Sequence, residues 1–115
     1  MKNNIIQEKS FAFAVRVVKA YQYIVNEKKE YVLSKQFLRS GTSIGANIEE
    51  AIGAQTTADF IAKLSISYKE ARETNYWIRL LFETGYLSNN EANSLLSDVL
   101  EIQKIIAKIK ITMEK

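Results

Sequence analysis

This chain of 115 residues contains no cysteine and no histidine, two residue types that carry much of protein chemistry. Without cysteine it has no disulfide and no thiolate ligand for a metal. Without histidine it has no Ser–His pair and no Glu-x-x-His metal motif of the kind used by di-iron helical bundles. It also lacks a Gly-x-x-x-x-Gly-Lys loop for nucleotide phosphates. We therefore expect a protein that is not an enzyme and that holds no metal or other cofactor.

Proline is also absent and there are only four glycines, which is typical of an all-helical protein. No apolar run approaches the roughly 20 residues that cross a bilayer, and the first residues have no apolar stretch of signal-peptide length. The missing cysteine is compatible with a reducing compartment. We expect a single domain over residues 1–115, in the cytoplasm of a bacterium and without a membrane partner.

The excess of positive charge lies in the first 28 residues. Five basic against two acidic side chains give +3 there, which is the net charge of the whole chain. Such an asymmetry is found in proteins that bind polyanions, although a charge of this size also serves solubility. These residues are Lys2, Lys9, Arg16, Lys19 and Lys28, with Glu8 and Glu27.

Lysine and arginine share one face of the first helix. Lys9 and Arg16 are seven residues apart, and Lys19 follows one turn later. We predict that these three side chains contact nucleic-acid phosphates; the alternative is a solvated face. Lys35 and Arg39 are weaker candidates for the same role, because acidic residues near them can pair with them.

Apolar periodicity predicts an all-α, antiparallel up-down bundle of four helices joined by short loops. The first helix spans residues 4 to about 26 and the second spans 35 to about 53, with Ser34 as its cap. The third starts at residue 56 or 57 and ends before Gly85, and Ser88 with Glu91 forms a capping box for the fourth. The rows that we expect to be buried are Phe11, Val15, Val18 and Val25 with Ala14, Val17, Tyr21 and Ile24 in the first helix; Leu33, Phe37, Ser40, Ile44, Asn47, Ala51 and Ala54 in the second; Phe60, Leu64, Ser67, Ala71, Thr74, Ile78 and Leu81 in the third; and Leu95, Val99, Ile102, Ile106, Ile109 and Met113 in the fourth.

The second helix is rich in small residues between positions 39 and 54. Glycine inside a helix costs roughly 1 kcal/mol relative to alanine, so Gly41 and Gly45 require a reason. We predict that another backbone or a ligand approaches closely at these two positions. Asn47 lies on the apolar row, and we expect its amide to bond the backbone or a neighbouring serine.

The runs KEYVLSKQFLRSGTSIGANIEEA and ADFIAKLSISYKEARETNYWIRLLFETGYL resemble the four-helix-bundle family encoded in intervening sequences of bacterial 23S ribosomal RNA genes. The family signature is a basic residue followed by Ser-Ile-x-x-Asn-Ile-x-Glu. The chain has Ala51 where many members have glycine. The matching residues here are Arg39, Ser43, Ile44, Asn47, Ile48 and Glu50, with Gly45 inside the signature.

The resemblance implies an antiparallel four-helix bundle and a cyclic homo-oligomer, namely a homopentamer. A related branch, the accessory proteins of diversity-generating retroelements, implies a basic pentameric barrel that binds nucleic acid and a reverse transcriptase. Two functions stay open. One is an oligomer that contacts RNA or DNA phosphates without base specificity; the other is an oligomeric adaptor that binds another protein and no nucleic acid.

Four carboxylates of the second and third helices could meet between these helices. Glu49 and Glu50 lie on the second helix, and Glu70 and Glu73 lie on the third. We predict that Lys69, Arg72 and Arg39 neutralise these carboxylates, so that they form no metal centre.

Overall fold

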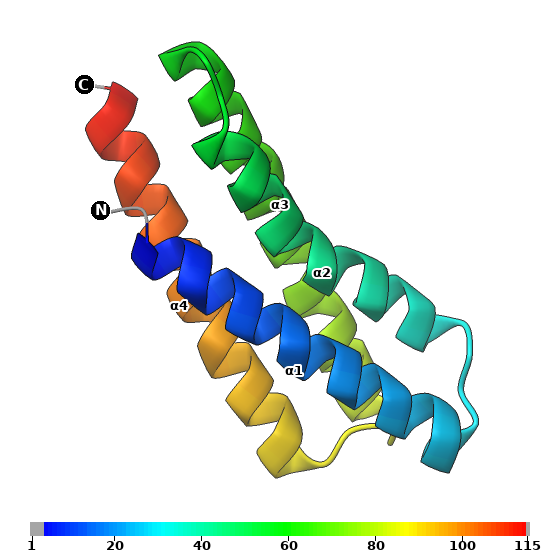
Figure 1. The fold of residues 1–115 in the computed structure, drawn as a ribbon. Helices are drawn as coiled ribbons and strands as arrows, with labels where there is room; N and C mark the ends of the chain where they lie inside the picture. Colours follow the sequence, from blue (N-terminus) through cyan, green and yellow to red (C-terminus); the bar gives the residue numbers. More distant parts are fainter. Residues whose placement is uncertain (1–3, 115) are drawn as a thin grey trace.

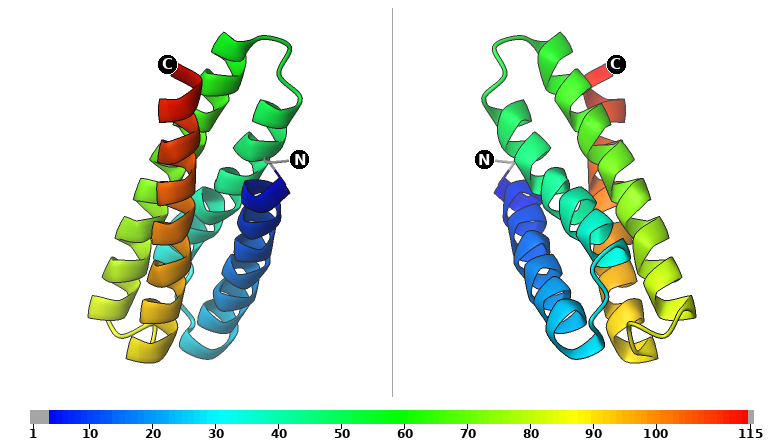
Figure 2. Two further views of the ribbon diagram at one scale, coloured as in Figure 1. Left: turned by 90° about the vertical axis from the view of Figure 1, so that its left-hand side faces the viewer. Right: turned by 90° about the vertical axis from the view of Figure 1, so that its right-hand side faces the viewer.

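The computed structural model describes residues 4–114, and the side chains of residues 5–114. These residues form helices α1 (Asn4–Lys28), α2 (Leu33–Ile52), α3 (Thr57–Glu83) and α4 (Asn89–Glu114). The helices run alternately up and down, and each packs against the next, with α4 closing onto α1 (Figures 1 and 2). The bundle measures 45 × 20 × 20 Å. The predicted all-α four-helix bundle is confirmed.

Helices α2, α3 and α4 bury most of the residues that their sequences predict to be buried. Six of the seven predicted α3 positions are fully buried, and Phe60 is partly buried. In α2, Ile48 is fully buried although it is not in the predicted row, while its neighbour Asn47 is in that row and is only partly buried. Met113 of α4 is exposed, because α1 begins short of the end of α4 and leaves its last turns uncovered (Figure 2).

The predicted core row of α1 is wrong in part. Phe11, Val15 and Val18 are 67%, 40% and 37% exposed. Apolar residues occur on most sides of this helix, so periodicity alone could not select the side that faces the core. Packing selects the row that passes the small residues of α2. The buried residues of α1 are Ile6, Ser10, Phe13, Val17, Ala20 and Ile24.

Glu30 caps α2, which corrects the prediction that Ser34 does so. The Glu30 carboxylate accepts the backbone N–H groups of Val32, Leu33 and Ser34 at 3.0, 2.9 and 2.7 Å. Ser34 lies buried inside the first turn, and its hydroxyl donates to the Glu30 carbonyl at 2.7 Å. Burial raises the pKa of the Glu30 carboxyl, but the three backbone donors outweigh this effect and lower it overall.

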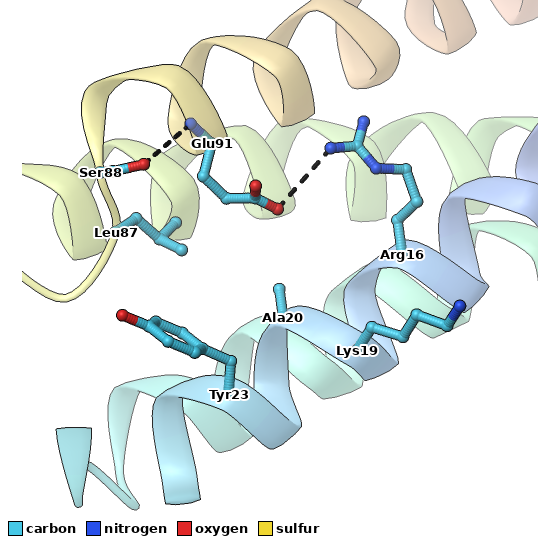
Figure 3. A pocket seen from close by; sticks show the side chains of 7 residues that line it. All are labelled: Arg16, Lys19, Ala20, Tyr23, Leu87, Ser88 and Glu91. Carbon is cyan, nitrogen blue, oxygen red and sulfur yellow. Dashed lines mark hydrogen bonds and ion pairs between the residues drawn. The ribbon is translucent and has the colours of Figure 1, made fainter. Parts of the chain in front are cut away.

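The other helix ends largely follow their predicted signals. The Thr56 hydroxyl accepts the N–H of Asp59 at 3.0 Å and so caps α3. Gly85, at φ +89°, forms the predicted left-handed end of α3. Of the capping box, the structure shows only the half in which the Ser88 hydroxyl accepts the N–H of Glu91, at 3.1 Å. The Glu91 carboxylate instead lies toward α1 (Figure 3).

The close approach predicted at Gly41 and Gly45 is made by α1. A Cβ atom at Gly41 would lie 2.7 Å from both γ-carbons of Val17. A Cβ atom at Gly45 would lie 3.3 Å from the backbone oxygen of Ser10. The two glycines therefore let α1 pack against α2 at a short distance. None of the helices in residues 4–114 is long and apolar enough to cross a membrane.

Candidate interaction surfaces

Two of the predicted phosphate contacts on α1 are paired with carboxylates of α4. The Lys9 Nζ lies 3.2 Å from a Glu101 oxygen. The Arg16 guanidinium lies 2.6 Å from Asp98 and 3.7 Å from Glu91. This side of α1 therefore faces α4, and much of its positive charge is neutralised there. Lys2, which precedes Lys9 by seven residues in the sequence, lies outside the described residues.

Arg39 is also paired, with two of the four carboxylates that we predicted to meet between α2 and α3. The full cluster does not form, because Glu49 turns to α1 and accepts the Gln7 amide at 2.9 Å. Of the predicted cations, Lys69 and Arg72 have no carboxylate within 4.0 Å among residues 5–114. The Arg39 guanidinium donates to Glu70 at 3.3 Å and to Glu73. The indole N–H of Trp77 donates to the same Glu73 carboxylate at 3.0 Å. A phosphate could use Arg39 only by displacing these carboxylates. On the same side of the bundle, Lys63 lies 3.8 Å from Glu50.

Lys19 and Lys35 are exposed and have no carboxylate within 4.0 Å among residues 5–114. Lys19 borders a cavity of about 360 Å³ between α1 and the start of α4 (Figure 3). Arg16 and the ring of Tyr23 border the same cavity, so it combines two cations with an aromatic face. Glu91 also lines it and holds Arg16. The complete lining is Arg16, Lys19, Ala20, Tyr23, Leu87, Ser88 and Glu91.

The polar residues of the family signature bond mainly within the bundle. The Ser43 hydroxyl donates to the Arg39 carbonyl at 2.7 Å. The Asn47 amide donates to the Ser43 carbonyl at 2.9 Å, which is the backbone bond that we predicted. The backbone oxygen of Ile44 accepts the hydroxyl of the buried Ser67 on α3 at 2.8 Å. The first two bonds lie within α2, and the third joins α2 to α3.

The sequence interpretation missed an exposed apolar surface on α1. Phe11, Val15 and Val18 follow each other at spacings of four and three, so they form one row on a helix. We call these three residues the α1 apolar row. The signal was present in the sequence as an apolar stripe, but it was assigned to the core of the bundle.

Comparisons with known proteins agree with this architecture. The family model of the 23S rRNA-intervening sequence protein matches residues 2–108. A crystal structure of a protein with unknown function from the S23 ribosomal protein family of Bacteroides thetaiotaomicron is 51% identical to this chain. The match covers 100% of both chains with a TM-score of 0.94. No curated protein showed a significant match. The chain therefore belongs to the 23S rRNA-intervening sequence protein family.

Proposed function

We propose that this protein is a non-enzymatic binding protein that assembles into a homo-oligomer through the α1 apolar row. The exposure of Phe11, Val15 and Val18 carries this proposal. Full burial of a valine or phenylalanine side chain contributes about 1.5–3 kcal/mol. A row of three such residues on one helix face gives an interface an apolar centre, which interfaces between copies of a chain commonly have.

A second copy of the chain is the partner that we propose for this row. Ile52 at the end of α2 and Ile66 on α3 are also exposed, at 38% and 40%, so the bundle carries apolar groups on more than one helix. Contact between two different surfaces of identical chains closes into a ring when the rotation fits. Five copies is the number that the family resemblance implies.

The molar mass in solution tests this proposal. We expect the parent to elute as an oligomer at micromolar concentration in size-exclusion chromatography with light scattering. Replacing Phe11 and Val18 together by Ser should shift it to the monomer. Val32→Ser is the matched control, because Val32 is 71% exposed in the loop before α2 and lies off the row. A monomeric parent, or a double variant that stays oligomeric, would contradict the proposal.

The second candidate function is binding of RNA or DNA through phosphate contacts. The observation that favours it is the pair of exposed lysines without carboxylate partners, Lys19 and Lys35. In this function Lys9, Arg16 and Arg39 exchange a carboxylate partner for a phosphate. Binding of this kind is insensitive to base sequence and weakens steeply with salt. If nucleic acid does not bind, an oligomeric adaptor for another protein is the function that remains.

A salt titration tests the second candidate. Lys9, Arg16 and Lys19 are replaced together by Gln, the oligomer mass is checked, and structured RNA and duplex DNA are titrated at several salt concentrations. Each lost phosphate contact should flatten the salt dependence by about one unit of slope. Equal binding by parent and variant would show that these three residues are not the contacts. No binding by either below about 100 micromolar at low salt would contradict the nucleic-acid function itself.

A further inference from the structure

The outer sides of α3 and α4 carry five exposed cations. Within residues 5–114, none of the five has a carboxylate oxygen within 4.0 Å. This contrasts with α1, where Lys9 and Arg16 are both paired. We call this surface the α3–α4 basic face, and its residues are Lys69, Arg72 and Arg79 on α3 with Lys104 and Lys108 on α4.

The bundle separates charge in the middle of these two helices, although at the end of α3 the exposed Glu83 lies four residues after Arg79 and on the same side. Glu70 and Glu73 of α3 turn toward α2, where both contact Arg39. On α4, Asp98 and Glu101 turn toward α1 and pair with Arg16 and Lys9. The carboxylates in the middle of α3 and α4 are therefore used in holding the bundle together. The cations of the same helix segments remain on the outside.

The cations on α3 share one face of that helix. Lys69, Arg72 and Arg79 are separated by three and seven residues, and Tyr76 occupies the position between the two arginines. This row lies away from Glu70 and Glu73, the residues that face α2. Helix α4 packs beside α3 along its length (Figure 2). Lys104 of α4 therefore adds a cation from the neighbouring helix to those of α3.

Arg79 is held in position by its neighbours. Its Nε donates to the Asn75 side-chain oxygen at 2.8 Å, and its guanidinium lies over the Tyr76 ring, 5.9 Å from the centroid. The Tyr76 ring packs edge to face on Trp77, with 5.0 Å between centroids. The Nε bond leaves the two terminal nitrogens available, and this planar fork matches two oxygens of one phosphate.

We infer that the α3–α4 basic face binds the phosphate backbone of a nucleic acid. Arg72 and Arg79 are seven residues apart, or about 10 Å along the helix, so one small anion cannot bridge them. A nucleic-acid strand repeats its charge about every 3.4 Å and can meet several of these cations at once. This inference rests on the nucleic-acid function proposed second above, and it assigns that function to a different surface from α1.

Two variants of equal charge test the assignment. The face variant replaces Arg72, Arg79 and Lys104 by Gln, and the control is the α1 variant with Lys9, Arg16 and Lys19 replaced by Gln. Each removes three positive charges, so a difference between them reports position and not net charge. Binding of duplex RNA and duplex DNA is followed by fluorescence anisotropy at several salt concentrations. Circular dichroism and molar mass confirm that each variant keeps its fold and assembly.

We expect the face variant to lose at least tenfold in affinity at low salt and two to three units of salt slope, about 0.9 unit for each lost contact. The α1 variant should keep affinity within about threefold of the parent, because two of its three cations, Lys9 and Arg16, are already paired with carboxylates of α4. A third variant, with Arg72 and Arg79 replaced by Lys, keeps the charge and should retain most of the binding.

Four results would overturn the inference. A larger loss in the α1 variant would place the contacts on α1, as the second candidate function does. Equal losses in both would show an effect of net charge alone. A parent that binds neither duplex would overturn this inference and the nucleic-acid function together, and would leave the oligomer untouched. Binding to anionic lipid vesicles is measured alongside. A face variant that loses vesicle binding but keeps duplex binding would show that this face binds a lipid surface instead.

Discussion

At the scale of single residues, Glu30 shows how one carboxylate can begin a helix from outside it. Lys29 adopts a positive φ of 56°, which turns the chain after α1 and places Glu30 before α2. The Glu30 carboxylate then accepts three backbone N–H groups that have no partner within the helix. The sequence indicated the break near residues 26–30. It could not indicate this cap, because serine is the commoner cap and Ser34 stood in a plausible position.

Removal of the Glu30 charge tests this cap. At pH 7, Glu30→Gln should lower the free energy of unfolding by about 0.5–2 kcal/mol, the usual contribution of a helix cap. The pKa of Glu30 is lower in the folded chain than in the unfolded chain. The stabilisation is therefore present above the unfolded carboxyl value of about 4.3, and it is lost as the pH falls through the folded value.

Urea unfolding at several pH values measures this effect, and Glu27→Gln in the last turn of α1 serves as the control for loss of a carboxylate. We expect the gap between parent and Glu30→Gln to narrow as the pH falls below the unfolded carboxyl value of about 4.3 and through the lower folded pKa. Equal stability of the two at pH 7 would show that the three hydrogen bonds contribute nothing net.

At the scale of elements, the contact between α1 and α2 depends on two glycines in a long helix. The sequence predicted close approach at Gly41 and Gly45, since glycine is unfavourable inside a helix without such a reason. It could not predict which element approaches. Both sites face α1, where Val17 and Ser10 occupy the space that a side chain would need.

Gly41→Ala should overpack this contact. The new Cβ would lie 2.7 Å from both methyl groups of Val17, a fully buried residue that has little room to move. We expect a loss of about 1–3 kcal/mol in the free energy of unfolding. Val17→Ala in the same chain removes both methyl groups, so the double variant should lose less than the sum of the single losses.

A double-mutant cycle by urea unfolding gives the coupling between the two sites, which we expect to be on the order of 1 kcal/mol. Gly53→Ala is the control for alanine in place of glycine, because a Cβ there meets only ordinary contacts, at 3.7 Å or more. Strictly additive losses would mean that Val17 does not limit the space at Gly41.

At the scale of the whole molecule, the sequence determined the number and order of the helices, because α3 and α4 each have one dominant apolar row. It misjudged α1, since Phe11, Val15 and Val18 continue the apolar pattern around that helix. The sequence also pointed to α1 as the basic surface. A count of charged residues along the chain does not show which of them pair across the bundle. Folding brings Asp98 and Glu101 to α1, while the five exposed cations on α3 and α4 have no carboxylate within 4.0 Å among residues 5–114.

The exposed α1 row also predicts how stability depends on concentration. If another copy covers Phe11 and Val18, unfolding includes dissociation, so the folded state gains stability by mass action. Between about 1 and 100 micromolar protein, the free energy of unfolding per protomer should rise by up to about 2 kcal/mol. Urea midpoints at the two concentrations measure this rise. The Phe11→Ser, Val18→Ser double variant should unfold at one midpoint, whereas Val32→Ser should follow the parent. Superimposed curves for the parent would mean that the row stays in contact with water.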